Sequence, residues 1–255
     1  MILTKKFPQL TLAMALAASF GYYQEAWAAQ VLATARTTGQ TVAPSVAPAD
    51  HLWVALNIVL PPAGAPGRRQ GAAGRNFCPQ LPDRNKPLTA LVPDPDQHLA
   101  QTISEHPTFW FYIPYRSEQV YIGKFMLKDQ NDEIIYEGEV ALPEEPGIIG
   151  LELPETIALS ESQEYYWHFR IQCSEEKSSA FDYVEGPIKR VKLEIPGETA
   201  PLRERLNFYA ANGLWYELIT ELAKNPGAEW VKVLDFVGLG AIAREPIHFR
   251  RTLEP

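Results

Sequence analysis

Nine residues in the second half of the chain alternate strictly between two kinds of side chain. In the segment 165–173 (YYWHFRIQC), the odd positions are Tyr, Trp, Phe, Ile and Cys, and the even positions are Tyr, His, Arg and Gln. Side chains of a β-strand point alternately to opposite faces, so this period of two predicts a strand with one face in a core. Strands of this kind are typical of antiparallel sheets with one solvated face.

Other segments have similar strand character and are separated by polar turns. The expected total is about seven short strands, which indicates an antiparallel β-sandwich over residues 88–196. Leu159 precedes Tyr165 by six residues across a polar turn, and this arrangement resembles the tyrosine corner of immunoglobulin and fibronectin-III domains. We therefore predict a mainly β fold of the immunoglobulin/fibronectin-III type. The strands we expect besides 165–173 are 109–115, 119–128, 133–142, 147–153 and 188–195.

The hydrophobic period changes after Pro201. Apolar residues recur at helical spacing in 202–210 and again in 214–222, with Asn212-Gly213 between the two stripes. A third helix is expected over 229–237, followed by Gly238. The sequence thus predicts a small helical hairpin or three-helix segment in a C-terminal module, 197–255. A single hairpin cannot bury its own apolar face, so it should dock on the sandwich, on the third helix or on a partner.

The first 28 residues have the three parts of a secretory signal peptide. Lys5 and Lys6 form a positive region, the apolar stretch 10–20 follows, and Ala26 and Ala28 suit cleavage after residue 28. We expect an exported protein, periplasmic or extracellular, without a transmembrane segment in the mature chain. Residues 29–60 are interpreted as a flexible lead segment with one strand-like stretch at 51–60, and residues 61–87 as a loop rich in Pro, Gly and Arg.

The chain contains two cysteines, Cys78 and Cys173. In the oxidising compartment that the signal peptide implies, the simplest expectation is a disulfide between them, and two buried free thiols are the alternative. Neither cysteine has a Cys or His neighbour at ligand spacing, so we predict no metal site.

Charge and motif content exclude several functions. The net charge of −8 argues against nucleic-acid binding. The sequence shows no nucleophile elbow, zinc-protease helix or phosphate-binding loop, and no cofactor is expected. Gly238 to Ala243 matches the residue pattern of a dinucleotide-binding motif, but it follows a predicted helix, whereas the motif requires a preceding strand.

Several ordered motifs resemble domain-of-unknown-function family 928. The resemblance covers about Pro61 to Ile247 and implies a cyanobacterial secreted or periplasmic protein. The family has no established activity, so it supplies no catalytic residues. The motifs that carry the resemblance are 64–69 (GAPGRR), Cys78, 88–93 (LTALVP), 106–115 (HPTFWFYIPY), Tyr166-Trp167 ahead of Cys173, Glu185-Gly186 before Ile188 and Arg190, 209–216 (YAANGLWY) and 237–239 (VGL).

Three groups of residues are candidates for a partner or ligand surface. Trp110 and Tyr112 face opposite to Phe109 and Phe111, so they form either a stacking platform for a sugar or a surface covered by the helices. An arginine loop could clamp an anionic polymer or be a solvated linker. An aromatic pair at the second helix could anchor a partner or pack in the hairpin. The arginine loop consists of Arg68, Arg69 and Arg75, and the aromatic pair at the second helix is Trp215 and Tyr216.

Three functions remain open from sequence. The leading hypothesis is a non-enzymatic protein-interaction module that binds another protein of the periplasm or cell envelope. The second is a glycan-binding module that uses Trp110, Tyr112 or the arginine loop. The third is an enzyme with a non-standard site built on His168 or on carboxylates such as Asp182 and Glu185.

Overall fold

The computed structural model describes residues 56–71, 78, 83, 85–176, 180–195, 197 and 200–254. The predicted signal peptide, most of the predicted lead segment and Arg75 lie outside these residues. All described residues belong to one compact unit, Val54–Pro255, so the strands and the C-terminal helices are not separate domains.

The strands form two sheets. A four-stranded sheet has the order β1–β3–β6–β9, in which β9 runs parallel to β6 and the other neighbours are antiparallel. A five-stranded sheet has the order β2–β8–β7–β4–β5, in which β2 runs parallel to β8 and the rest are antiparallel. The strands are β1 (Thr89–Ala90), β2 (Gln101–Thr102), β3 (Thr108–Ile113), β4 (Ile122–Asp129), β5 (Ile134–Val140), β6 (Gly147–Glu152), β7 (Glu164–Gln172), β8 (Phe181–Arg190) and β9 (Ile247–Thr252).

Aromatic rings from both sheets meet in the core. Phe111 of β3 stacks on Phe169 of β7 with ring centroids 4.5 Å apart, and Phe109 lies 4.8 Å from Phe125 of β4. The alternation in 165–173 therefore has the predicted meaning, since Trp167, Phe169 and their odd-numbered neighbours are buried and the even positions are partly exposed. Burial of these rings supplies the main hydrophobic contribution to stability in this part of the molecule.

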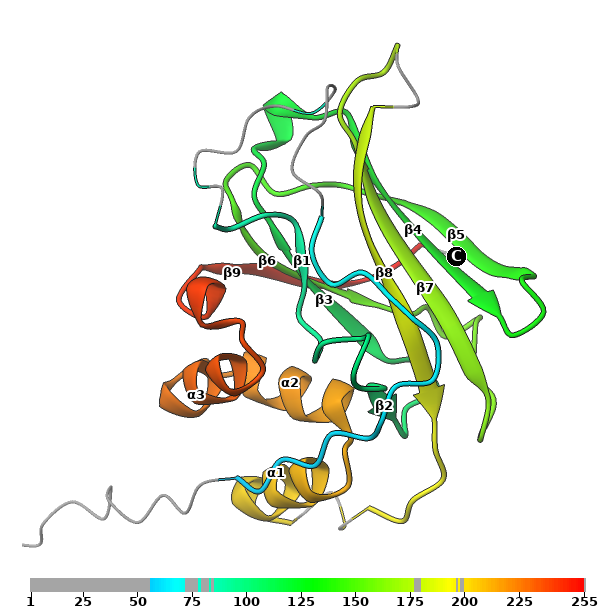
Figure 1. Ribbon diagram of the computed structural model, residues 1–255, viewed down its shortest axis with the longest axis vertical. Helices are drawn as coiled ribbons and strands as arrows, with labels where there is room; N and C mark the ends of the chain where they lie inside the picture. Colours follow the sequence, from blue (N-terminus) through cyan, green and yellow to red (C-terminus); the bar gives the residue numbers. More distant parts are fainter. Residues whose placement is uncertain are drawn as a thin grey trace, which may run out of the picture. The chain divides into compact units, whose positions relative to one another are not determined.

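Three helices follow the sheets at nearly the predicted positions. They are α1 (Leu202–Ala211), α2 (Trp215–Ala223) and α3 (Ala228–Phe236). Gly213 and Gly238 follow α1 and α3 with φ of 69° and 77°, a left-handed conformation that favours glycine at a helix end. The helices lie on the side of the four-stranded sheet that faces away from β4 and β7 (Figure 1).

Residues 56–71 run across the unit as an extended segment, which we call the lead strap. Its backbone N–H groups donate to Ala210 of α1, to Gln97 before β2 and to Glu185 of β8, and Ala90 of β1 donates back to it. The strap, cyan in Figure 1, passes from α1 along β2 and β8. The predicted strand at 51–60 is not formed over its described part, 56–60, because these residues meet a helix and loops rather than a sheet edge.

The disulfide joins Cys78 to Cys173, 95 residues further along the chain. Cys173 follows β7 directly, so the bond ties the segment that follows the strap to the five-stranded sheet. The pairing is the one that we expected from the sequence.

Two strand predictions differ from the structure. The strand expected at 188–195 is β8 at 181–190, because Gly186 and Pro187 interrupt the alternation by which a strand is recognised. The C-terminal module, predicted over 197–255 as a helical hairpin or three-helix segment, also contains the strand β9, which returns to the four-stranded sheet beside β6. The strands β1 and β2, two residues each, were not predicted.

Candidate functional site

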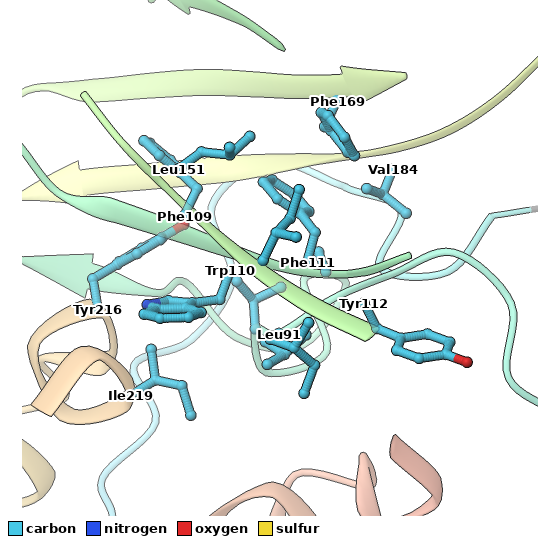
Figure 2. Packing of buried hydrophobic residues seen from close by; sticks show 14 of the residues in the cluster. Leu91, Phe109, Trp110, Phe111, Tyr112, Leu151, Phe169, Val184, Tyr216 and Ile219 are labelled. Atoms are coloured by element: carbon cyan, nitrogen blue, oxygen red, sulfur yellow. The ribbon is translucent and has the colours of Figure 1, made fainter. Parts of the chain in front are cut away.

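The aromatic pair of β3 is buried, and helix α2 covers Trp110. Trp110 and Tyr112 lie on the face of the four-stranded sheet opposite Phe109 and Phe111, as the alternation predicts, yet all four are buried. The indole Nε1 of Trp110 donates a hydrogen bond to Thr220 Oγ1 of α2 at 2.9 Å. Figure 2 shows Trp110 beside Ile219 and pointing away from the core between the sheets. Of the two alternatives, the structure has the covered surface: Trp110 lies against α2 and Tyr112 is buried, so neither ring is free to stack on a sugar.

The pair at the start of α2 is buried as well. Trp215 Nε1 donates to the carbonyl of Leu91 at 2.7 Å, so it fastens the helix to the loop after β1. The ring of Tyr216 packs edge-on against Phe109 with centroids 5.4 Å apart (Figure 2). These two residues are corrected from candidate partner anchors to docking contacts between the helices and the sheets.

The two described arginines of the predicted loop have different surroundings. Arg69 is half-buried and donates from Nη1 to the carbonyl of Val237 at the end of α3, at 2.7 Å. Burial lowers the pKa of Arg69 below its ordinary value, against the opposing charge of Asp94. Arg68 instead lies with its guanidinium carbon 4.4 Å from the ring centroid of Tyr183 on β8. Arg68 thus remains a candidate for ligand contact, and Arg69 has a structural role.

Tyr183 brings Arg68 together with a second candidate, His168. The imidazole of His168 lies 5.2 Å from the Tyr183 ring, and Phe181 lies 5.7 Å from it on the other side. Arg170 is the register partner of Tyr183 across β7 and β8. All belong to the outer face of the five-stranded sheet or its edge. We call this set the β7–β8 patch: Arg68, His168, Arg170, Phe181 and Tyr183.

The patch combines open apolar surface with unpaired positive charge. Phe181 is 40% exposed, whereas most rings of this sheet are in the core. Within the described residues neither Arg68 nor Arg170 makes an ion pair, although eleven ion pairs occur elsewhere in that part of the chain. Burial lowers the pKa of His168, and the charges of Arg170 and Lys128 lower it further. His168 is therefore neutral at pH 7 and offers a hydrogen-bonding nitrogen rather than a charge.

Of the carboxylates considered for catalysis, the fold uses that of Asp182, whereas Glu185 is engaged through its backbone. Asp182 is buried and accepts a hydrogen bond from Tyr115 Oη at 2.9 Å. The backbone of Glu185 pairs with the backbone of Arg68 in both directions, at 2.8 and 2.9 Å. The structure does not bring His168 into hydrogen-bond contact with either carboxylate.

Sequence reasoning missed Tyr183 and Phe181, which complete the patch. Their strand was placed seven residues too late, so their shared face was not recognised. The signal was an alternation over 181–185. Phe181, Tyr183 and Glu185 face outward, and the residues between them, Asp182 and Val184, are buried.

In the part of the chain that the structure describes, no group of three or more His, Cys, Asp or Glu side chains is arranged to hold a metal ion. Among the same residues, no helix has the length and apolar character required to cross a membrane.

These features define a disulfide-bonded, two-sheet β protein with three C-terminal helices. Residues 68–247 match the family described as Domain of Unknown Function (DUF928), and the chain belongs to that family. The match includes the whole β7–β8 patch and all three helices. No curated protein and no solved structure matches the chain.

Proposed function

We propose that this protein is an exported, non-enzymatic interaction module that binds an acidic segment of another protein of the periplasm or cell envelope. The β7–β8 patch is the proposed contact surface. The same proposal assigns the sheets to an immunoglobulin/fibronectin-III-like sandwich.

The strand order supports the fold assignment. Immunoglobulin-type sandwiches place strands A, B and E in one sheet and C, F and G in the other. The corresponding series here is β1, β3 and β6 in one sheet and β4, β7 and β8 in the other. In addition, the backbone N–H of Ser160 donates to Tyr165 Oη at 2.8 Å, which is the contact that a tyrosine corner requires.

The observation that carries the binding role is the contrast between the two outer sheet faces. The helices cover the outer face of the four-stranded sheet, where Trp110 and Tyr112 are buried. The corresponding face of the other sheet carries Tyr183 beside Arg68 and Arg170, neither of which makes an ion pair within the described residues, and the exposed ring of Phe181. Aromatic residues and arginine are enriched where proteins bind one another.

Charge complementarity favours a partner that is acidic at the contact. The chain as a whole has a net charge of −8, whereas the patch carries two arginines that make no ion pair with any residue the structure describes. Arginine binds carboxylates through paired hydrogen bonds and keeps its charge at any physiological pH.

Export is supported by the N-terminal pattern of charged, apolar and small residues and by the disulfide, which is stable in an oxidising compartment. In the cytosol, by contrast, cysteines are kept reduced and disulfides are rare.

The test is affinity capture from a cell-envelope extract with wild-type protein and an Arg170→Glu variant. Lys192→Glu is the matched control, because it makes the same charge change at a side chain that is 77% exposed and outside the patch. We expect a specific protein to be captured by wild type and by the control, and at least tenfold less by Arg170→Glu. Its recovery should fall as salt is raised.

Two outcomes contradict the proposal. Equal capture by all three proteins would show that the patch is not the contact. Binding to glycans on an array, lost in Arg170→Glu and without any captured protein, would replace the interaction module by a glycan-binding module. Circular dichroism of each variant confirms that folding is unchanged.

A further inference from the structure

A polar cleft of about 170 Å³ lies between helices α1 and α2 and the ends of strands β3, β6 and β9. Its lining includes no residue of the β7–β8 patch. Its lining includes three carboxylates, Glu152, Glu217 and Glu221, together with one arginine, Arg250.

Two of these carboxylates have cationic partners. Glu152 forms an ion pair with Arg250. Glu221 is paired with Arg205 at 2.7 Å and with Lys224 at 2.6 Å, and these hydrogen bonds hold its pKa below the ordinary value although burial acts in the other direction. Both are therefore charge-neutralised within the fold.

Glu217 has no cationic partner among the described residues. Its Oε1 atom accepts three hydrogen bonds, from Thr102 Oγ1 at 2.5 Å and from the backbone N–H groups of Ile103 and Ser104 at 3.0 and 3.2 Å. Its Oε2 atom is buried and has no hydrogen-bond donor in the described part of the chain. The fold thus fixes the carboxyl group firmly by one oxygen and leaves the other unsatisfied, which is costly unless a ligand or solvent supplies a donor.

Burial raises the pKa of Glu217, while the hydrogen bonds to its Oε1 atom lower it. A positive charge near Oε2 would remove the penalty of burying this carboxylate.

The other polar groups of the cleft suit an ammonium ligand. His106 donates from Nδ1 to the carbonyl of Ile157 at 3.1 Å, because a carbonyl oxygen can only accept. In the neutral ring, Nε2 is then an acceptor. At about 30 Å³ for each water-sized group, the cleft has room for an ammonium group and a short alkyl chain.

We propose that this cleft binds a primary ammonium group on a short alkyl chain, with Glu217 as its counter-ion. The ammonium donates to the carboxylate and to neighbouring acceptors such as His106. Two sources carry this chemistry, a free alkylamine and the lysine side chain of another protein.

The test is isothermal titration of the full chain with n-butylammonium, with the amide of Nα-acetyllysine, and with n-pentanol as an uncharged ligand of similar size. We expect at least one of the two amines to bind and pentanol not to bind. Binding of butylammonium alone assigns the site to a small amine, and binding of the lysine derivative assigns it to a lysine side chain. Absence of binding by both amines, or equal binding of pentanol, overturns the proposal.

Glu217→Gln keeps the shape of the side chain and removes its charge, so it should weaken amine binding at least tenfold. Glu221→Gln is the matched control, since that carboxylate already has two cations, and it should change binding less than about threefold. Equal loss in both variants would contradict the assignment to Glu217. If Glu217→Gln does not fold, the titration of the wild-type protein with the amines and with pentanol still tests the proposal. Neither result depends on the protein partner of the β7–β8 patch.

Discussion

The carboxyl group of Asp182 is held by the fold from several directions. Tyr115 Oη donates to its Oδ2 atom and the backbone N–H of Tyr183 donates to its Oδ1 atom at 3.0 Å. Gly71 of the lead strap approaches so closely that a Cβ at that position would lie 2.2 Å from Oδ1. Burial raises the pKa of Asp182, and the hydrogen bonds and the charge of Arg68 oppose this effect. These contacts favour a structural role for Asp182 over catalysis.

The raised pKa predicts the pH dependence of stability. The folded state holds the Asp182 proton more tightly than the unfolded state, so its contribution is full below the ordinary pKa of 3.8 and is lost as the pH rises through the raised value. We expect Asp182→Asn to remove this decrease in unfolding free energy above pH 4. Urea denaturation between pH 3 and pH 8 measures it. Glu118→Gln, at an exposed carboxyl, is the control, and equal profiles for wild type and Asp182→Asn would refute the assignment.

The side chains of 109–113 separate what local sequence predicts from what depends on tertiary contacts. The alternation at 109–113 correctly separated Phe109 and Phe111 from Trp110 and Tyr112. The alternation does not predict whether the face of Trp110 and Tyr112 is exposed or covered, because periodicity shows which side chains share a face and not what packs against it. Here a helix more than a hundred residues away in sequence covers Trp110.

Among the elements, the helices were the most predictable and the edges of the sheets the least. Each helix carries its own apolar stripe and ends near a glycine, so local sequence contains the evidence. β1 and β2 are two residues long and exist only because a neighbouring strand pairs with them. β9 (IHFRRT) is mostly exposed and carries two arginines, and it is defined by its pairing with β6. Such strands depend on tertiary context.

Strand β9 closes the edge of β6 and fastens the helices to the sheet. Leu253 just after it is buried and donates from its N–H to the carbonyl of Glu152 at 2.8 Å. Tyr136 Oη of β5 donates to the carbonyl of Glu254 at 2.8 Å. Five of the six residues of β6 are buried. Without β9, the edge of this buried strand would be unpaired.

Removal of residues 247–255 should therefore expose an apolar strand edge. We expect the shortened protein to lose stability and to self-associate, because unpaired strand edges recruit other chains. Light scattering after size-exclusion chromatography measures the association, and removal of Pro255 alone is the control. A monomeric shortened protein with unchanged unfolding would show that β9 is dispensable.

For the whole molecule, residues distant in sequence are joined by the strap and by one covalent bond. The strap contacts α1, β8 and β1. The disulfide joins two cysteines that are 95 residues apart in sequence. The family and the disulfide pairing were predictable from sequence, since both depend on residue identity. The path of the strap was not, because its Pro- and Gly-rich composition has no period that marks a partner.

Loss of the disulfide should reduce the unfolding free energy substantially. In the chain-entropy model, a loop of this length contributes about 4–5 kcal/mol by restricting the unfolded state. We expect Cys78→Ser/Cys173→Ser to show a loss approaching that value in chemical denaturation. Reduction of wild type with dithiothreitol should match it, and a double variant as stable as oxidised wild type would contradict this role.

The pairing of β6 with β9 also has a consequence for the order of events during biosynthesis. A chain that emerges N-terminus first presents β6 long before the strand that completes its sheet. The four-stranded sheet can reach its final arrangement only when β9 has emerged. The rate of folding is then governed by closure of long loops rather than by local helix formation. A prematurely terminated product would keep an open edge, and it would be distinguished from the finished protein by its susceptibility to proteases.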